Sequence, residues 1–210
     1  PKETRLRYRV GAIHTFDFWG FFRRMGKTKL YVNGGGSLIQ DVTSTRSLQY
    51  YLSNIALAKK RGNQVLMYGC GIGPVSSPAN RRAAGRTINQ YVDAITLREP
   101  GSARELQEMG VTRPKISITA DPALLLDPAP PEAVEAFLRT QGIDPDEKHV
   151  LFVLRPWQGM EEKLPVFAAA ARWCYEKKGM VPVFFALEPK RDRAVAEQVA
   201  AMVDCPHHIV

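Results

Sequence analysis

Short apolar segments alternate with segments of helical periodicity along most of the chain. Each apolar run is rich in β-branched residues and is bounded by Gly or Pro, which is typical of buried parallel strands. Repeated strand–helix alternation favours an α/β fold with parallel sheets and right-handed crossovers. We expect strands within residues 7–13, 29–34, 64–69, 93–99, 115–120, 150–156 and 180–187, and helices near 17–26, 45–61, 78–92, 100–109, 131–141, 161–178 and 190–203.

A proline-rich stretch interrupts this alternation between residues 122 and 145. It contains five prolines, and a fresh strand follows it. We therefore expect a first Rossmann-like domain over residues 1–127, an interdomain segment with a connecting helix over 128–147, and the start of a second Rossmann-like domain over 148–210.

The charge and the cysteines narrow the class of protein. Lys and Arg outnumber Asp and Glu by 29 to 21. The basic residues lie mostly in helical stretches and lack the aromatic interleaving of nucleic-acid binders, so solvated helix faces are the plain interpretation. Where the charge contributes to binding, phosphorylated ligands or an anionic membrane surface fit better than DNA. The three cysteines lack C-x-x-C spacing, and there is no signal peptide or membrane span, so we expect a cytoplasmic protein whose true N-terminus is missing.

The segment VNGGGSLIQD follows a predicted strand directly. Its three glycines, Gly34, Gly35 and Gly36, precede Ser37. At the carboxyl end of a parallel strand, glycines allow positive φ angles or let backbone N–H groups approach an anion, and the positive end of a following helix adds to the attraction. The spacing matches neither a dinucleotide fingerprint nor a P-loop, and an ordinary tight turn is the alternative.

Two further strand ends carry residues that suit the same purpose. The predicted strand QVLMYG runs into CGIGP, which includes Gly71, and the predicted strand DAITLRE contains Arg98 near its end. If the three strands are parallel and adjacent, two glycine loops and one guanidinium meet in a crevice that suits a small anionic ligand. A surface ion pair of Arg98 with Glu99 or Glu105 is the alternative.

Five segments occur in the order and spacing of the bacterial polysaccharide pyruvyltransferases: NGGGSLIQDVTSTRSLQYYL, YGCGIGP, AITLRE, TADPALLL and VLRPW. The chain closely resembles the CsaB type of this family over nearly its whole length. The resemblance implies a GT-B-like fold of two Rossmann-like domains facing a cleft. It also implies that the first domain lacks its N-terminal strand and that the second is truncated before a G-x-R-L-H motif with a catalytic His. We therefore expect an internal fragment that is inactive alone.

The activity implied by the resemblance is transfer of the pyruvyl group of phosphoenolpyruvate to a sugar as a ketal, with release of phosphate. The implied acceptor is a lipid-linked or polymeric sugar, often N-acetylmannosamine of a cell-wall polysaccharide precursor. A location at the inner face of the membrane would suit that acceptor. No separate cofactor, metal or nucleic acid is expected. Two other functions stay open, a GT-B glycosyltransferase that uses a nucleotide sugar and a noncatalytic module that binds an anion or a sugar.

The resemblance also suggests roles for individual residues. Arg98 matches the donor-binding arginine of the family, and the glycine loops would donate N–H groups to the donor. Asp41 is a candidate base or acceptor of a sugar hydroxyl, with a helix N-cap as the alternative. Arg155 ends the first strand of the second domain and is a candidate for the cleft, with packing against Trp157 as the alternative. We expect Asp121 to hold the interdomain turn.

The remaining reactive or aromatic side chains have structural interpretations. Cys70 stands where relatives often carry Gln and is not a proposed nucleophile. The four histidines offer no set of three ligands at metal spacing, although a strand should start at His207–His208. We expect Trp19, Phe21 and Phe22 to form the packing face of the helix at 17–26.

Overall fold

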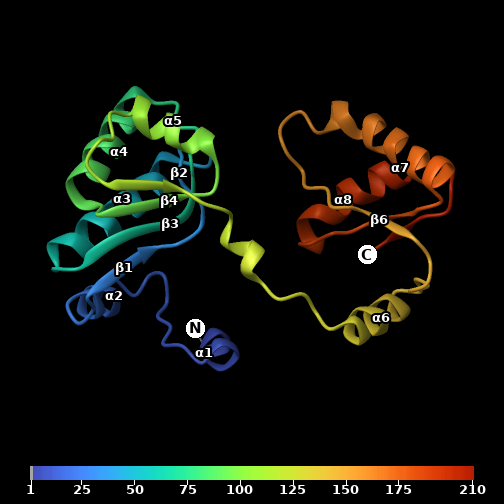
Figure 1. Cartoon of the computed structure of the whole chain (residues 1–210), viewed down its shortest axis with the longest axis horizontal. Coiled ribbons are helices and arrows are strands. Elements are labelled where there is room, and N and C mark those ends of the chain that lie inside the picture. Colours follow the sequence, from blue (N-terminus) through green and yellow to red (C-terminus); the bar gives the residue numbers. More distant parts are fainter. Residues whose placement is uncertain (1) are drawn as a thin grey trace. The chain divides into compact units, whose positions relative to one another are not determined.

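The structure is a computed structural model that describes residues 2–210. It divides into two compact units, with the division between Leu126 and Asp127. Each unit has its own parallel sheet and its own hydrophobic core (Figure 1). The predicted α/β class with parallel sheets is therefore confirmed.

The first unit is built around five strands. The sheet has the order β1-β3-β4-β5, and β2 also pairs with β3. All of these pairings are parallel, as the alternation of strands and helices predicted. The elements are α1 (Lys2–Tyr8), α2 (Phe18–Met25), β1 (Leu30–Asn33), β2 (Gly36–Ile39), α3 (Thr45–Lys60), β3 (Gln64–Ile72), α4 (Pro78–Tyr91), β4 (Ala94–Leu97), α5 (Pro100–Glu108), β5 (Lys115–Ile118) and the 3-10 helix η1 (Pro122–Leu125).

Strand β2 was not predicted, and it changes how the glycine segment is read. Leu30 of β1 lies opposite Gln64 of β3, and Gly36 of β2 lies opposite Cys70 at the same offset. Ile39 lies opposite Ile72, so the register shifts by one residue within β2. Both strands pair with β3. Strands β1 and β2 therefore form one interrupted line along one edge of β3. Glycine destabilises a strand. The sequence pattern therefore predicted a loop, not a strand, for the residues that begin at Gly36.

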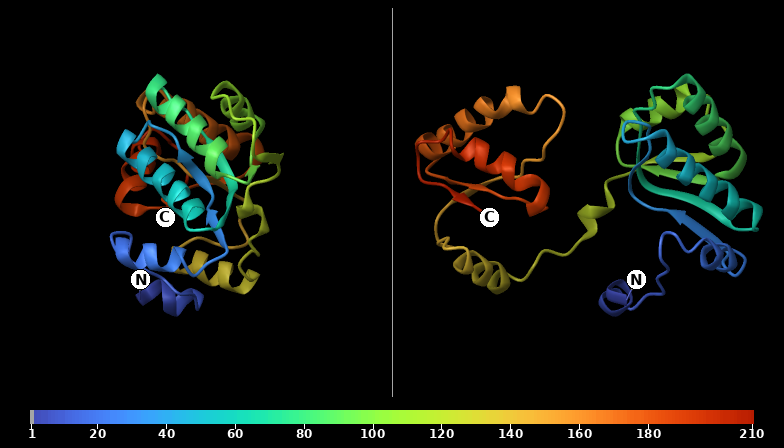
Figure 2. Two further views of the ribbon diagram at one scale, coloured as in Figure 1. Left: turned by 90° about the vertical axis from the view of Figure 1, so that its left-hand side faces the viewer. Right: turned by 180° about the vertical axis from the view of Figure 1, so that it is seen from behind.

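Helix α3 shows why the helical predictions succeed. The Ser44 side chain accepts a hydrogen bond from the backbone N–H of Ser47 at 3.0 Å, which caps the first turn. The buried residues of α3 recur at helical spacing and form one face. Each fully buried Leu or Ile contributes about 1.5–3 kcal/mol to stability through the hydrophobic effect. That face consists of Leu48, Leu52, Ile55 and Ala58. Helices α3 and α4 pack side by side (Figure 2).

The N-terminal residues differ from the prediction. Residues 7–13 were expected to form a strand, whereas α1 occupies Lys2–Tyr8 and an irregular segment follows it. The alternation of Arg with apolar residues imitates a strand, but no described strand pairs with this segment. A helix satisfies its backbone groups internally, without a neighbouring strand. Helix α1 buries none of its residues, and it lies apart from the sheet in both views of Figure 2.

Helix α2 also differs in part. Phe21 packs against the core of the first unit and Met25 is buried, as expected for residues four positions apart on one face. Trp19 is 80% exposed and Phe22 is 38% exposed. The prediction that Trp19 packs inward is therefore wrong, because the face of Phe21 and Met25 is the one that meets the core.

The second unit contains a parallel sheet of order β6-β7-β8. Helix α7 ends at Gly179, whose φ of 60° makes it a left-handed cap. Strand β8 begins at His208, which confirms the predicted strand start. The elements are α6 (Pro131–Thr140), β6 (His149–Phe152), the 3-10 helix η2 (Glu161–Lys163), α7 (Leu164–Lys178), β7 (Val181–Phe184), α8 (Pro189–Ala200) and β8 (His208–Ile209).

Candidate functional site

The strand ends that carry the predicted site residues are neighbours. Strands β1, β3 and β4 are adjacent and parallel, so their carboxyl ends meet at one edge of the sheet. Strand β2 adds Ser37 to this edge, because it pairs with the last residues of β3. The condition on which the sequence prediction of a shared crevice depended is therefore met within the first unit.

The guanidinium of Arg98 is held between two side chains at this edge. Its Nη1 donates to Oδ2 of Asp121 at 2.9 Å, and its Nη2 donates to Oγ of Ser37 at 3.3 Å. The backbone N–H of Arg98 donates to the carbonyl of Cys70 at 3.3 Å. A guanidinium has five N–H donors, so donors remain for a ligand.

The ion pairs considered as alternatives for Arg98 do not form. Glu99 accepts a hydrogen bond from Oγ of Ser102 at 2.6 Å, and Glu105 pairs with Arg81 at 2.6 Å. The partner of Arg98 is instead Asp121, which follows the next strand of the sheet. The sequence signal was the TADP segment after β5, although it was read as an interdomain turn. Asp121 does cap η1 through the backbone N–H of Ala123 at 2.9 Å.

The Asp121 carboxylate balances part of the Arg98 charge. Its pKa is lowered, first by the hydrogen bond from the backbone N–H of Ala123 and then by the hydrogen bond from Arg98. Asp121 is therefore ionised at neutral pH. The side chains of Arg98 and Asp121 are 31% and 41% exposed, so a ligand can reach the pair from solvent.

Gly71 makes room for this arrangement. It lies inside β3 rather than in the loop that was predicted, because the strand continues to Ile72. A Cβ atom added at Gly71 would lie 2.6 Å from Oγ of Ser37 and 3.2 Å from Nη2 of Arg98. Any side chain at this position would displace the groups that contact each other above it.

The three consecutive glycines differ from one another. Gly36 has a φ of 94°, which disfavours other residues. A Cβ atom at Gly35 would make an ordinary contact of 3.6 Å with the Gly69 carbonyl, and one at Gly34 would meet nothing within 4 Å. The helix expected after these glycines is α3, and strand β2 and residues 40–44 lie between them. Only Gly34 and Gly35 lie outside the strands.

Two features beside these residues were not identified from the sequence. A cavity of about 240 Å³ is lined by Tyr68, Thr96, Thr119 and Asp121, among others. The amide Nδ2 of Asn33 is buried at the end of β1 and has no hydrogen-bond partner within residues 2–210. A buried donor without a partner is costly unless water or a ligand satisfies it. In the sequence, the position of Asn33 directly before the glycines was the feature that could have indicated this buried amide.

The Asp41 carboxylate accepts hydrogen bonds from residues at the start of α4. It accepts from the backbone N–H groups of Ser76 at 2.8 Å and Ser77 at 3.0 Å, and from Nδ2 of Asn80 at 2.9 Å. These hydrogen bonds, that of Asn80 first, lower the pKa of Asp41. The alternative role as N-cap of the following helix belongs to Ser44 instead. This geometry favours a structural role over that of a base.

Arg155 is engaged within the second unit. Its Nε lies 3.2 Å from Oδ1 of Asp192, whose side chain is buried, and its Nη2 lies 3.2 Å from Oε2 of Glu188. Hydrogen bonding to Asp192 raises the pKa of Arg155. The predicted alternative of packing against Trp157 gives way to these ion pairs. The prediction that Arg155 ends this unit's first strand is wrong, because β6 ends at Phe152. The other predicted donor-binding residues belong to the first unit.

The remaining candidates for reactivity are accounted for as follows. Burial raises the pKa of the Cys70 thiol to about 11, so it is protonated at neutral pH. Within residues 2–210 no group of three or more His, Cys, Asp or Glu side chains is placed to hold a metal ion. None of the helices in the same range combines the length and the apolarity that a membrane crossing requires.

The fold and the site define a parallel α/β protein whose strand ends bring together a guanidinium, a hydroxyl and glycines. A family model described as polysaccharide pyruvyl transferase matches residues 1–204 of the 210-residue chain. The chain therefore belongs to the polysaccharide pyruvyl transferase family, a family of enzymes, and the predicted family is confirmed. A search of curated proteins gave no match.

Proposed function

We propose that the enzyme uses phosphoenolpyruvate as its donor and transfers the pyruvyl group to two hydroxyls of a sugar as a ketal. The observation that carries the proposal is the guanidinium of Arg98, fixed by Asp121 and Ser37 above Gly71. Phosphoenolpyruvate is small and carries a carboxylate and a phosphate, both of which match a guanidinium that donates two parallel hydrogen bonds. The family name specifies the pyruvyl group, and the partly exposed guanidinium of Arg98 supports an anionic donor for it.

The proposed reaction begins with protonation of the donor's methylene carbon. The adjacent carbon then bears positive charge, and a sugar hydroxyl adds to it. A second hydroxyl displaces phosphate from the same carbon, so one carbon–oxygen bond to phosphate breaks and two carbon–oxygen bonds to the sugar form. One hydroxyl proton is balanced by the proton that the methylene gained, and the other leaves with phosphate. Arg98 is proposed to bind the donor and to stabilise the charge that develops on the departing phosphate.

The acceptor is proposed to be a sugar of a lipid-linked cell-wall polysaccharide precursor, with N-acetylmannosamine as the first sugar to test. Support comes from the family, whose name specifies a polysaccharide. The proposed location is the cytoplasm, at the inner face of the membrane, where a lipid-linked acceptor is accessible. The GT-B arrangement of the two units and the CsaB type stay predictions.

Thermal unfolding with and without ligands tests the donor. A ligand that binds only the folded state raises stability by about 2.7 kcal/mol at 100 times its Kd. For a protein of this size that corresponds to a rise in Tm of about 5–10 °C. Phosphoenolpyruvate should produce this shift, whereas inorganic phosphate and nucleotide sugars at equal concentration should produce a smaller one.

The matched variant Arg98→Ala should lose the phosphoenolpyruvate shift. Release of phosphate from phosphoenolpyruvate in the presence of N-acetylmannosaminyl acceptors then tests the transfer itself. A Tm shift with nucleotide sugars and none with phosphoenolpyruvate would assign the site to a glycosyltransferase-like donor and reject the proposal.

A further inference from the structure

Positive charge is concentrated at the N-terminal end of the first unit. Residues 2–29 contain eight Lys and Arg residues against two acidic residues, Glu3 and Asp17, a net charge of +6 out of +8 for the whole chain. All eight basic residues are exposed. None of them forms an ion pair with a carboxylate of residues 2–210. The charge excess noted in the sequence is therefore local and not neutralised.

The same residues expose large apolar side chains. Exposed fractions reach 82% for Leu6, 75% for Phe16 and 80% for Trp19, and Tyr8, Val10 and Phe18 are also exposed. Single exposed apolar residues are common on protein surfaces, but a cluster of them marks an interaction site. Aromatic rings next to unpaired cations are typical of segments that lie in a membrane interface.

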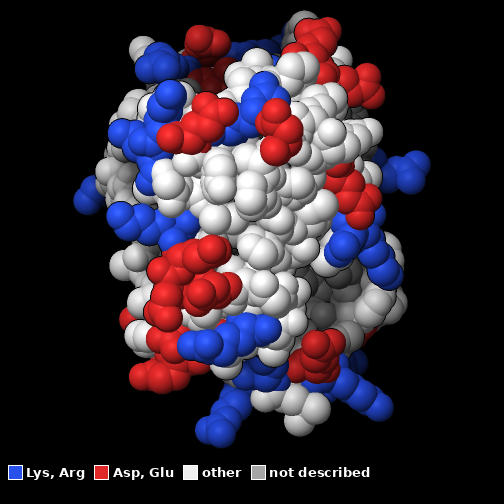
Figure 3. Space-filling model, turned by 90° about the vertical axis from the view of Figure 1, so that its right-hand side faces the viewer, with Lys and Arg blue, Asp and Glu red and all other residues white. Residues whose placement is uncertain are grey.

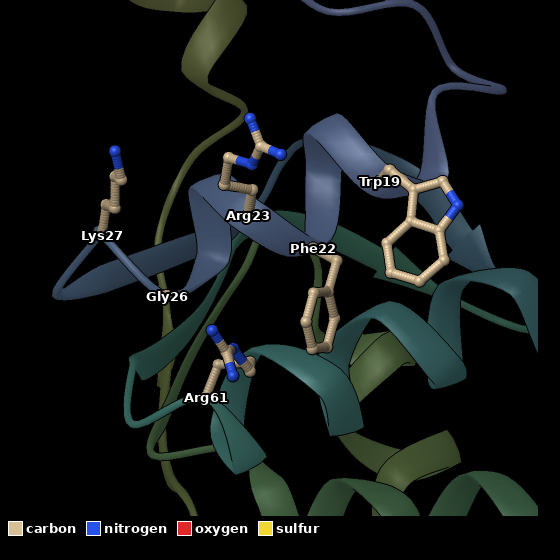
Figure 4. A pocket seen from close by; sticks show the side chains of 6 residues that line it. All are labelled: Trp19, Phe22, Arg23, Gly26, Lys27 and Arg61. Atoms are coloured by element: carbon tan, nitrogen blue, oxygen red, sulfur yellow. The ribbon is translucent and has the colours of Figure 1, made fainter.

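A hollow of about 460 Å³ lies within this surface, between α2 and the end of α3. Figure 4 shows that Trp19, Phe22 and Arg23 come from α2 and that Arg61 comes from the end of α3. The Arg61 guanidinium lies 4.3 Å from the centre of the Phe22 ring, and the rings of Trp19 and Phe22 are nearly perpendicular, with their centres 6.4 Å apart.

The hollow is lined by cations and aromatic rings. Gly26 and Lys27 complete it, and no acidic side chain lines it. A Cβ atom at Gly26 would collide with the Arg61 guanidinium, so the glycine allows Arg61 to reach the hollow. Three cations around one hollow suit a phosphate group, and the neighbouring rings suit the acyl chains or glycerol beside it.

We propose that residues 2–29, together with Arg61, form a docking surface for a membrane of anionic phospholipids, here called the N-terminal docking surface. The cations would contact lipid phosphates while Leu6, Phe16 and Trp19 enter the boundary between headgroups and acyl chains. Charge complementarity selects an anionic partner, and the exposed aliphatic side chains select a lipid surface over a nucleic acid, which offers phosphates but little for Leu6 or Val10 to enter.

Another face of the molecule provides a contrast. On the face seen in Figure 3, acidic and basic side chains are interspersed around uncharged atoms. In the second unit, Lys178 lies 5.3 Å from the ring centre of Trp173, which is half exposed at the end of α7. This pair has the same chemistry as Trp19 and its neighbouring cations with a smaller surrounding charge excess, Arg172, Lys177 and Lys178 against Glu176, so it is a matched control.

The proposed lipid-linked acceptor would explain why the enzyme binds a membrane, and the inference rests on the proposed function in this respect alone. Its test is co-sedimentation of the protein with vesicles of equimolar phosphatidylglycerol and phosphatidylcholine, against vesicles of phosphatidylcholine alone, without donor or acceptor. Phosphoenolpyruvate-dependent melting of the same preparation is measured in parallel. Loss of vesicle binding with an intact melting shift would reject this inference alone, and the reverse result would reject the donor alone.

We expect binding to the anionic vesicles that weakens with salt and little binding to the neutral ones. The double variant Arg23→Gln/Lys27→Gln should bind about 30-fold more weakly. Each cation near an anionic surface raises the affinity about fivefold, and the variant removes two cations. Trp19→Ala should bind about tenfold more weakly. The controls Lys177→Gln/Lys178→Gln and Trp173→Ala should stay within about twofold of the original protein.

Three results would overturn the inference. They are equal binding to both kinds of vesicle, wild-type binding by the Arg23→Gln/Lys27→Gln variant, and tighter binding to a single-stranded RNA oligonucleotide than to the vesicles. All substituted side chains are exposed or half-exposed, so unchanged thermal unfolding of the variants verifies that loss of binding is not loss of folding.

Discussion

The guanidinium Nη1 of Arg98 donates to the carboxylate Oδ2 of Asp121 at 2.9 Å, and this contact joins the ends of the neighbouring strands β4 and β5. Both side chains are partly exposed, so the pair contributes little to stability. Its effect is on orientation, because a guanidinium fixed at one edge presents its other N–H groups in a defined direction.

Arg98→Ala should therefore weaken use of phosphoenolpyruvate more than it perturbs folding. Hydrogen bonds to a charged group contribute about 1.5–3 kcal/mol, so kcat/KM for the donor should fall about 10- to 150-fold. Arg98→Lys should recover only part of this loss, because lysine lacks the planar pair of donors. The control is Arg193→Ala, which removes an exposed ion pair with Glu197. An unchanged dependence on phosphoenolpyruvate would exclude Arg98 from the donor site.

Gly71→Ala should damage both stability and donor binding. The added methyl group would lie 2.6 Å from Oγ of Ser37, and overpacking of this kind costs about 1–3 kcal/mol. Gly34→Ala is the matched control, since its methyl group would meet nothing within 4 Å. Urea unfolding gives the stabilities, and the melting shift with phosphoenolpyruvate gives the binding. Equal stability of the two variants would contradict the crowding at Gly71.

Gly36→Ala should cost about 1–2 kcal/mol of unfolding free energy, because its φ of 94° is unfavourable for any residue with a Cβ atom. Gly35→Ala should cost far less, as its methyl group would make only ordinary contacts. Chemical unfolding of the two variants separates them, and a Gly35 variant that is the less stable of the two would reverse the assignment.

Asp41 should contribute to stability in a pH-dependent way. Its pKa is lowered in the folded protein, first by Asn80 and then by Ser76. The contribution is therefore complete above the unfolded pKa of about 4 and is lost as the pH falls through the folded pKa. Asp41→Asn should flatten the loss of stability below about pH 4, and Asn80→Ala should flatten it in part. Urea unfolding across this range is the measurement, and an unchanged slope in Asp41→Asn would contradict it.

Cys70 should resist alkylation while the protein is folded. A pKa of about 11 leaves about one thousandth of the thiol ionised at pH 8, and the side chain is buried as well. Iodoacetamide should label the partly exposed Cys174 first, as mass spectrometry of the peptides would show. Cys70→Ala should retain donor turnover. Rapid labelling of Cys70, or loss of turnover in Cys70→Ala without loss of folding, would give the thiol a role in the reaction.

Local features explain which parts of the fold could be predicted. Helix α3 was expected at 45–61 and occupies Thr45–Lys60, because its apolar spacing and its terminal lysines lie within the segment and its cap, Ser44, directly precedes it. The parallel arrangement of β1, β3 and β4 followed from the alternation with helices. Residues 7–13 were expected to form a strand, but strand formation depends on a partner that no local pattern reveals.

The candidate site was predictable only in outline. The position of Arg98 at a strand end follows from the sequence, whereas its pairing with Asp121 depends on the order of the strands in the sheet. The contact of Ser37 with Arg98 depends on strand β2. This strand begins with a glycine, so the sequence pattern did not predict it. The exposure of Trp19 could not be predicted from the spacing of apolar residues alone. Which face of α2 packs on the core depends on how the helix is placed in the fold.

The break between β1 and β2 has a consequence for how this chain tolerates length changes. Gly34 and Gly35 lie outside both strands, so a residue inserted between them lengthens a connection and can leave the pairing of β2 with β3 unchanged. Side chains alternate between the two faces of a strand, so a residue inserted between Gly36 and Ser37 would turn Ser37 away from Arg98. Two adjacent insertion points therefore differ in their effect on one contact of the candidate site.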